Sequence, residues 1–360
     1  MVKWLIPFLL FFCLTYVFGG EYSEVVEKDY PLRSLGNLNI VHSKGDVSIH
    51  GWAVDKVRVI LKKRVIADSS EKAKQLFELL DYRYEGYKDR IEISNQYGKL
   101  MNIGDRLQEK NNPKTRSDLV IFAPSKVQLK VWVVDGKVAL KFWNERVEVR
   151  SRSGSIELEN VRGKTVSVAC SSCLAVLKQI YADIKVSSKS GRVDLDTVQG
   201  SQIFVENESG FIQLFHVEGE QLYISQNGAI SGRWLKGNLS FNTQQASVKL
   251  KEVSGTVSGA TDSGDIHCAM REWKAKDETL LESVQGTISL EMPKYFSANL
   301  DLWSLQGGIA LRFPFQKIPD PLLVGPEPAG HLVGVVRGGG EVLKVITESG
   351  DIHIVPRSDY

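Results

Sequence analysis

The stretch SGRVDLDTVQG, residues 190–200, holds one copy of the pattern that decides the fold of this 360-residue chain. SGSIELENVRG at 153–163 and SGFIQLFHVEG at 209–219 keep the same frame: a Ser-Gly pair, alternating apolar and polar residues, then Val-x-Gly. Such alternation is typical of a strand with one buried face, and glycine allows a turn with positive φ. Because a second alternating run precedes each Ser-Gly pair, every copy predicts two short strands separated by turns.

The frame recurs at intervals of 18 or 19 residues over much of the chain. Stacked coils must all turn at the same corner, whereas the hairpins of a sandwich have no reason to reuse one turn chemistry. We therefore predict an all-β fold, a parallel β-solenoid with 18–19-residue coils, and keep an antiparallel β-sandwich as the alternative. The corner position is occupied in turn by Gly136, Gly154, Cys173, Gly191, Gly210, Gly228, Ala246 and Gly264, with wider copies at Gly286, Gly307 and Gly350 and an early one at Gly45.

Departures from the period divide the chain. SSEKAKQLFELLDY at 69–82 places apolar residues on one helical face after a serine cap. The range 314–340 is rich in proline and glycine and is expected to be a loop. We expect, in order, a signal peptide (1–20), N-terminal strands plus the helix 69–82 (21–118), solenoid repeats (119–313), the loop (314–340) and a closing coil (341–360).

The N-terminal segment predicts export. Lys3 is followed by an uncharged apolar run from Trp4 to Phe18 and then by small residues, as in a secretory signal cleaved near Gly19 or Gly20. An uncleaved membrane anchor is the alternative, although the run is short for a span. The formal net charge of +2 gives no indication of nucleic acid binding. We expect the protein in the periplasm, the cell envelope or the extracellular space.

The order of motifs indicates a family. GDVSIHGWAVDKVRV at 45–59 and DLVIFAPSKVQLKVWVVDGKVAL at 118–140 precede the regular repeats, and GGGEVLKVITESGDIHIV at 338–355 closes them. In this order the chain resembles the bacterial "putative adhesin" family, a domain of unknown function related to the head-GIN domains. The resemblance implies an exported, non-catalytic β-solenoid of the cell envelope. It implies no binding residues, and Cys173 departs from the corner glycine of the pattern.

Cys170 and Cys173 form the sharpest local motif, CSSC, at a corner of the repeat. An oxidising compartment favours a local disulfide between them. Inert thiols, a redox pair and half of a metal site are the alternatives, but there is no second CxxC in the sequence. Cys268 occupies an inward position that other copies fill with leucine, which predicts a small buried core residue. We predict no metal site and no cofactor.

Other polar residues are better explained by roles in stabilising turns than by roles in binding or catalysis. Asp46, Asp265 and Asp351 directly follow corner glycines, where an aspartate can bond the turn backbone; ion binding is the alternative. His267 and His353 fall at outward positions.

The remaining chemical alternative is a β-helix enzyme acting on polysaccharide, a lyase or hydrolase, which needs paired carboxylates on neighbouring coils. Glu157 and Asp194 share an outward position and are two coils apart, roughly 9.6 Å by the strand spacing. No base, arginine or metal cluster accompanies them at matching positions, so we assign no catalytic residues.

Outward aromatic residues suggest contacts with other molecules, because flat ring faces suit sugars and proteins. The sequence thus predicts a non-catalytic, adhesin-like binding or scaffolding module of the envelope. Its expected partner is an envelope polysaccharide or another envelope protein, and not nucleic acid or, apart from an uncleaved N-terminal segment, a membrane. The candidate surface residues are Trp132, Phe204, Phe211, Phe215 and Trp303.

Overall fold

The computed structural model describes residues 20–33, 35–87, 89–95, 115–275, 278–318 and 330–358. Of the expected signal peptide, only Gly20 lies among these residues. None of the helices in this part of the chain has the length and apolar character needed to cross a membrane. The chain divides into two units, Met1–Glu157 and Leu158–Tyr360.

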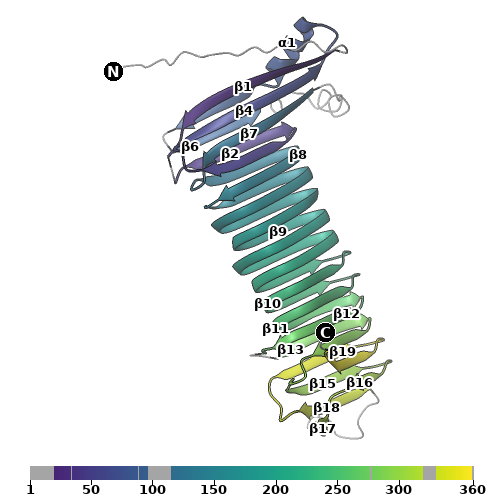
Figure 1. The fold of residues 1–360 in the computed structure, drawn as a ribbon. Coiled ribbons are helices and arrows are strands. Elements are labelled where there is room, and N and C mark those ends of the chain that lie inside the picture. Colours follow the sequence, from purple (N-terminus) through teal and green to yellow (C-terminus); the bar gives the residue numbers. More distant parts are fainter. Residues whose placement is uncertain are drawn as a thin grey trace. The chain divides into compact units, whose positions relative to one another are not determined.

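The second unit consists mainly of parallel strands that stack coil on coil (Figure 1). Its strands are most of β9 (Val147–Ser225), β10 (Ile230–Thr243), β11 (Val248–Ser263), β12 (Ile266–Trp273), β13 (Thr279–Gln285), β14 (Ile288–Met292), β15 (Ala298–Ser304), β16 (Ile309–Leu311), β17 (Phe315–Lys317), β18 (His331–Val336), β19 (Val342–Thr347) and β20 (Ile352–Pro356).

The register of these strands reproduces the period of the sequence. Ile230 lies between Ile212 and Val248, and Val248 pairs in turn with Ile266. Each step from 212 to 230, 248 and 266 is 18 residues, and every pairing in this series is parallel. The prediction of a parallel β-solenoid is therefore confirmed, and the antiparallel sandwich is wrong for these repeats.

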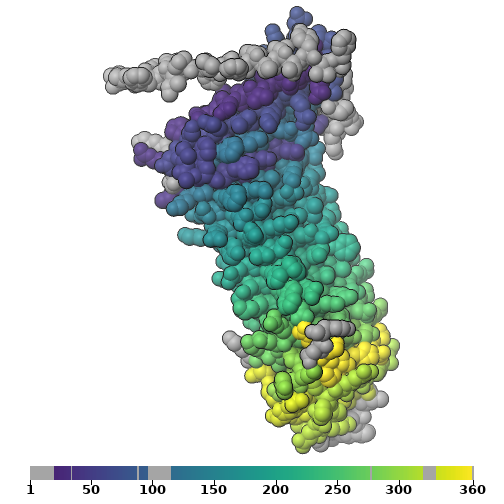
Figure 2. All heavy atoms as spheres, viewed as in Figure 1, coloured from purple at the N-terminus to yellow at the C-terminus, as the bar shows by residue number. Residues whose placement is uncertain are grey.

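Burial explains why the coils must stack. Ile212, Leu214 and Val217, inward residues of one coil, are at most 2% exposed, and each contributes about 1.5–3 kcal/mol by burial. Ordering the roughly 18 residues of a coil costs about 1–2 kcal/mol per residue in backbone entropy. One coil cannot balance that cost alone. Neighbouring coils supply the rest of the burial, and Figure 2 shows side chains closing the spaces between successive ribbons.

The last coil in sequence is not the last coil of the stack. β19 pairs in parallel with β13 on one side and β15 on the other (Figure 1). In the same way β20 lies between β14 and β16. The corner glycines stack in the order Gly286, Gly350, Gly307. This placement corrects the expectation of a closing coil at 341–360, because the segment is inserted between two earlier coils.

The strand β18 explains the inserted order and corrects the expected loop at 314–340. β18 runs antiparallel to β15 and also pairs with the short strand β17, so it returns the chain to the end at which β15 starts. A parallel neighbour must start at that same end, and the chain can enter β19 there. The alternation of HLVGVV is broken by Gly334, which hides this strand in the sequence. Residues 319–329 of the expected loop lie outside the described residues.

The first unit combines parallel stacking with antiparallel strands that the repeat does not predict. β2 and β3 both pair in parallel with β8, and the corner glycines Gly45 and Gly136 stack. In contrast, β4 pairs antiparallel with both β1 and β7, and β5 pairs antiparallel with β6. The bounds of these strands, with the start of β9 completing the unit, are β1 (Glu21–Pro31), β2 (Asn37–Lys44), β3 (Val47–Trp52), β4 (Lys56–Ile66), β5 (Tyr82–Tyr87), β6 (Arg90–Asn95), β7 (Thr115–Pro124) and β8 (Gln128–Trp143).

The helix of the first unit, α1 (Ser70–Leu79), lies within the predicted range 69–82. Ser69 caps it, since its Oγ accepts a hydrogen bond from the backbone N–H of Lys72 at 3.2 Å. The apolar face of the helix packs on the end of β4 and the residues that follow it. The buried cluster consists of Val65, Ala67, Ala73 and Leu80, with Tyr22, Leu76 and Phe77 at its margin.

Candidate functional site

In six successive coils a second corner is formed by a non-glycine residue with positive φ. The left-handed conformation costs an L-residue roughly 1–2 kcal/mol, and asparagine is among the few types that tolerate it well. Only one of the residues at this corner is an asparagine, so the others are not the types that the backbone prefers. In the second unit these residues are Asn160, Gln179, Thr197, His216, Trp234 and Glu252, with φ between 51° and 62°.

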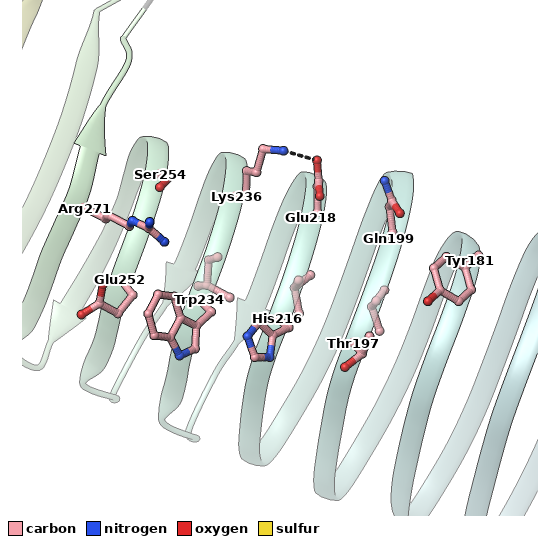
Figure 3. A pocket seen from close by; sticks show the side chains of 13 residues that line it. Tyr181, Thr197, Gln199, His216, Glu218, Trp234, Lys236, Glu252, Ser254 and Arg271 are labelled. Carbon is pink, nitrogen blue, oxygen red and sulfur yellow. Dashed lines mark hydrogen bonds and ion pairs between the residues drawn. The ribbon is translucent and has the colours of Figure 1, made fainter.

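Side chains of this corner line one wall of a groove along the second unit (Figure 3). We call Thr197, His216, Trp234 and Glu252 the corner ladder. The opposite wall, the outer row, comes from residues near the next turn: Tyr181, Gln199, Glu218, Lys236 and Ser254.

The buried side chains of Val198, Val217 and Leu235 also line the groove. Arg271 stands at one end (Figure 3). The groove has a volume of about 560 Å³, within the usual range for ligand sites. We refer to it as the Trp234 groove.

Trp234 is the centre of a cluster of flat and cationic side chains. The His216 ring stacks parallel to the indole, at 6.0 Å between centroids and 9° between planes, and Phe215 packs edge-on against His216 at 4.2 Å. The guanidinium groups of Arg233 and Arg271 lie 5.4 and 5.6 Å from the indole centroid. Both arginines are within the range of a cation–π interaction with the same ring.

The carboxylates of the groove are neutralised by partners outside the Trp234 cluster. Glu218 Oε1 lies 2.6 Å from Lys236 Nζ. Glu252 pairs with Arg357 in a partly buried contact. Arg233 and Arg271, by contrast, have no ion pair within the described residues. Arg271 lines the groove and Arg233 lies beside it against the same indole, so two cations are available to a ligand at this point.

Three of the aromatic residues predicted as surface residues are exposed. Trp132 is 54% exposed in the first unit, and Phe211 and Phe215 are 63% and 41% exposed in the second. Only Phe215 adjoins the Trp234 groove, through its contact with His216. Neither Trp132 nor Phe211 lines the groove, and both remain candidate contact points of their own.

The other two predicted aromatic residues are partly covered. Phe204 is half-buried, with Lys185 Nζ 5.8 Å from its ring centre. Trp303 is half-buried beneath the His331 ring, at 3.6 Å between centroids, and its Nε1 donates a hydrogen bond to Asp301 at 2.8 Å. His331 belongs to β18, the strand that the sequence did not indicate. Its ring covers one face of Trp303.

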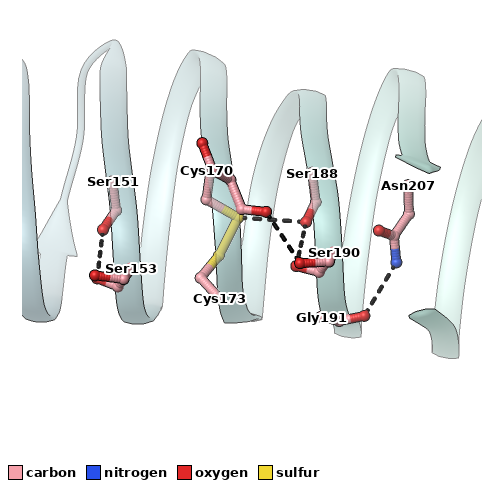
Figure 4. Close-up of a disulfide and its surroundings, with 9 residues drawn as sticks. Ser151, Ser153, Cys170, Cys173, Ser188, Ser190, Gly191 and Asn207 are labelled. Carbon is pink, nitrogen blue, oxygen red and sulfur yellow. Dashed lines mark hydrogen bonds between the residues drawn. A yellow bond between two sulfur atoms is a disulfide. The ribbon is translucent and has the colours of Figure 1, made fainter. Parts of the chain in front are cut away.

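Cys170 and Cys173 are joined in a disulfide and are 7% and 5% exposed (Figure 4). Ser188 takes the place of Cys170 in the next coil, and its Oγ donates a hydrogen bond to the carbonyl oxygen of Ser190 at 3.0 Å. The disulfide thus closes a corner that a serine hydrogen bond closes in the following coil. Neither cysteine lines the groove, so we assign the disulfide a structural role.

Cys268 is a fully buried thiol, in register with Leu250 and Leu290 as its sequence position predicts. Burial raises the pKa of its thiol to about 12, so that it stays protonated and unreactive. The described residues contain no group of three or more His, Cys, Asp or Glu side chains arranged to hold a metal ion.

The aspartates that follow corner glycines bond backbone N–H groups, as predicted, but those of a neighbouring coil. This bond ties one coil to another and occupies an oxygen that an ion would need. The acceptor atoms and donors are Asp46 Oδ1 with Lys137 N at 2.9 Å, Asp265 Oδ1 with Thr287 N at 2.9 Å, and Asp351 Oδ1 with Gly308 N at 2.7 Å.

His267 and His353 are both half-buried, with side-chain exposures of 32% and 44%. Burial lowers the pKa of His267, partly opposed by Glu291, whose carboxylate lies 3.4 Å from its Nε2. Neither histidine lines the groove.

The two carboxylates considered for catalysis are each held by a cation. Glu157 Oε2 lies 2.6 Å from Lys137 Nζ, and Asp194 Oδ1 lies 2.6 Å from Arg192 Nε. The two residues belong to different units, and neither lines the Trp234 groove.

The corner ladder was not predicted from the sequence. Its residues precede the apolar residue of each Val-x-Gly or Leu-x-Gly, a position that the apolar pattern does not mark. The available signal was the recurrence of polar and aromatic types at one position every 18 or 19 residues.

Comparison with known proteins identifies a family. A family model described as Toastrack DUF4097 matches residues 31–227 and 174–355, so its two copies together span most of the chain. The match confirms the resemblance to adhesin-like domains of unknown function that the motif order indicates. No curated protein matches the sequence.

Solved structures resemble the chain only distantly. They include a "putative cell adhesion protein" from Clostridium sporogenes, 11% identical over 93% of this chain and 100% of that one, with a TM-score of 0.20. A "putative lipid binding protein" from Parabacteroides distasonis is 12% identical over 75% and 97%, with a TM-score of 0.29. A "putative adhesin" from Bacteroides fragilis is 10% identical over 75% and 97%, with a TM-score of 0.26. Similarity at this level indicates nothing about what this chain binds.

Proposed function

This chain belongs to the Toastrack DUF4097 family, and we propose that it is an exported, non-catalytic protein of the cell envelope, an adhesin-like binding or scaffolding module. The observation that carries the proposal is the Trp234 groove. Its central indole is flanked by Arg271 and Arg233, neither of which has an ion pair within the described part of the chain, and it stands on a stack of hydrogen-bonded strands.

The construction of the groove favours binding. Its walls come from strands that are hydrogen-bonded to neighbours on both sides, so the side chains are held in place before a ligand arrives. Preorganisation of this kind reduces the entropy that is lost on binding. Tryptophan and arginine are also the residues that most often dominate binding energies.

Export is supported by residues elsewhere in the chain. The apolar run from Trp4 to Phe18 after Lys3 has the pattern of a secretory signal. The disulfide between Cys170 and Cys173 is of a kind that persists in oxidising compartments and is rare in the cytosol.

The alternative is an enzyme acting on polysaccharide. The observation in its favour is that two carboxylates, Glu218 and Glu252, line the same groove. Each is bound to a cation, however, and the described residues contain no metal cluster to assist them. Hydrolysis needs one carboxyl group that can give up a proton while a second acts as base or nucleophile. Binding therefore explains this arrangement better than catalysis does.

Retention of the purified protein on insoluble envelope material tests the proposal. We expect Trp234→Ala to reduce the retained fraction about tenfold, as loss of an aromatic anchor does, while the matched variant Trp132→Ala keeps it. If Trp132→Ala alone released the protein, the binding site would lie in the first unit instead. Equal retention of both variants and the parent would contradict a role for either tryptophan.

The same assay also tests for catalysis, because an enzyme would release soluble fragments from the envelope polysaccharide. We expect no soluble fragments to be released from the envelope polysaccharide. Fragment release that disappeared in Glu252→Gln or Asp194→Asn would replace the binding function by an enzymatic one.

A further inference from the structure

We propose that the ligand of the Trp234 groove is an acidic polysaccharide, a linear glycan that carries carboxylate groups and lies along the stack from the coil of Tyr181 to that of Arg271. The inference rests on the proposed binding function and adds the chemical class of the ligand.

The length of the groove favours a polymer. From Gln179 through the corner ladder to Arg271 the chain takes five steps from coil to coil, and at the spacing of parallel strands these span about 24 Å. Exposed residues line the groove over this length. A site of this length, with one side chain from each coil at the same position, matches a ligand that repeats along one axis.

The neutral residues of the groove suit a sugar chain. The Tyr181 ring, which is 40% exposed, offers a flat apolar surface on which a pyranose ring can pack, and the Trp234 cluster adds aromatic surface farther along the groove. The polar side chains of Thr197, Gln199 and Ser254 provide hydrogen-bond donors and acceptors for hydroxyl groups. A groove for a purely apolar ligand would have no use for these polar groups, which would lose water without gaining a partner.

The charges of the groove favour an anion. Arg233 and Arg271 both contact the indole of Trp234 through cation–π geometry. A guanidinium that packs on a ring keeps donors at its edge, and these match a carboxylate bidentately. Lys251 pairs in register with Arg233 and adds a third positive charge next to the site.

Nearby acidic groups do not cancel this charge. Glu218 and Glu252 have their own partners in Lys236 and Arg357. Glu272, the chain neighbour of Arg271, is held by Lys274 at 2.8 Å.

The pairing of the strands argues against an acidic peptide as the ligand. Extended peptides commonly bind by adding a strand to an open sheet edge. The coils that carry the groove have no open edge, because β10 is paired with β9 and β11 along its length, and β11 is paired with β12. Only side chains are available to a ligand there, and their repeat suits a glycan.

Titration calorimetry with the full chain tests the ligand class. The probes are polygalacturonate, the same polymer after reduction of its carboxyl groups to neutral alcohols, and poly-glutamate. We expect polygalacturonate to bind, the reduced polymer to bind at least about tenfold more weakly, and affinity to fall as salt rises. A hexamer of galacturonate should bind more tightly than a dimer, since it covers more of the groove.

Variants locate the binding. Arg271→Gln should weaken binding of polygalacturonate about tenfold, whereas Lys249→Gln, which removes the same charge from an exposed position outside the groove, should leave it within about twofold. Circular dichroism and thermal midpoints of both variants verify that they fold.

Each other outcome overturns a defined part of the inference. Equal affinity for the reduced polymer would overturn the acidic character of the ligand, and equal, Arg271-dependent affinity for poly-glutamate would overturn its identity as a glycan. If no polymer bound while the protein was still retained on envelope material, the ligand class would be wrong and the binding function would stand. Loss of that retention as well would remove the proposed function.

Discussion

Replacing Gly210 by alanine tests whether the coils stack at a shared corner. Gly210 has a φ of +125°, and a Cβ built on it would lie 1.8 Å from the carbonyl oxygen of Gly191 in the neighbouring coil. The strained backbone costs about 1–3 kcal/mol, and pushing the coils apart costs about 1–3 kcal/mol more. We therefore expect Gly210→Ala to lower the free energy of unfolding by about 2–6 kcal/mol.

Two further glycines separate the backbone strain from the clash. Gly338 has a φ of +84° but open space around its Cβ position, so alanine there should cost only about 1–2 kcal/mol. Gly86 has neither a positive φ nor a neighbour within 4 Å, and Gly86→Ala should be neutral or slightly stabilising. Urea unfolding followed by circular dichroism measures all three variants. An effect at Gly210 no larger than that at Gly338 would refute the close approach of the two coils.

Other residues give independent predictions. Burial lowers the pKa of His42 from 6.5 to about 4, so stability should be complete above about pH 6.5 and fall by up to about 3 kcal/mol toward pH 4; thermal midpoints of His42→Leu should lack this dependence. Thr197→Asn should raise the free energy of unfolding by about 0.5–1 kcal/mol in urea unfolding, since asparagine tolerates the left-handed corner better. Cys170→Ser combined with Cys173→Gly should cost only about 1 kcal/mol in urea unfolding, because loss of a short-loop disulfide is partly offset by the serine hydrogen bond.

The core of the solenoid could be predicted because each coil repeats one simple physical rule. Val193 and Leu195 alternate with Asp194, and the structure buries the first two while leaving the aspartate partly exposed. A period of two residues fixes which side chains face inward wherever one face of a strand is buried. The same rule placed Cys268 in the core.

The order of the last coils could not be predicted, because their local patterns are alike. The corners at Gly286, Gly307 and Gly350 share one chemistry, so nothing near them states which coil stacks on which. That order depends on β18, a strand whose alternation is interrupted and whose partner β15 is distant in sequence. The cover that β18 gives to Trp303 was missed for the same reason.

The candidate site could not be predicted from the sequence, because its residues lie outside the alternating pattern of buried apolar positions. His216 and Trp234 sit at a corner where the backbone requires a positive φ but any side chain can project outward. The prediction of exposed aromatic residues found Phe215, next to the groove, but not the ring at its centre. An outward ladder becomes visible only when the register between coils is known.

Hydroxyl-radical footprinting of the full chain, with and without polygalacturonate, tests the central claim most directly, because it reports which side chains a bound polymer covers. We predict that the polymer protects Trp234, His216 and Tyr181 from oxidation and leaves Trp132 and Phe211 unchanged, since the first three line the groove and the last two do not. Protection centred on Trp132, or a bound polymer that leaves Trp234 as reactive as before, would contradict the claim that this chain binds through the Trp234 groove.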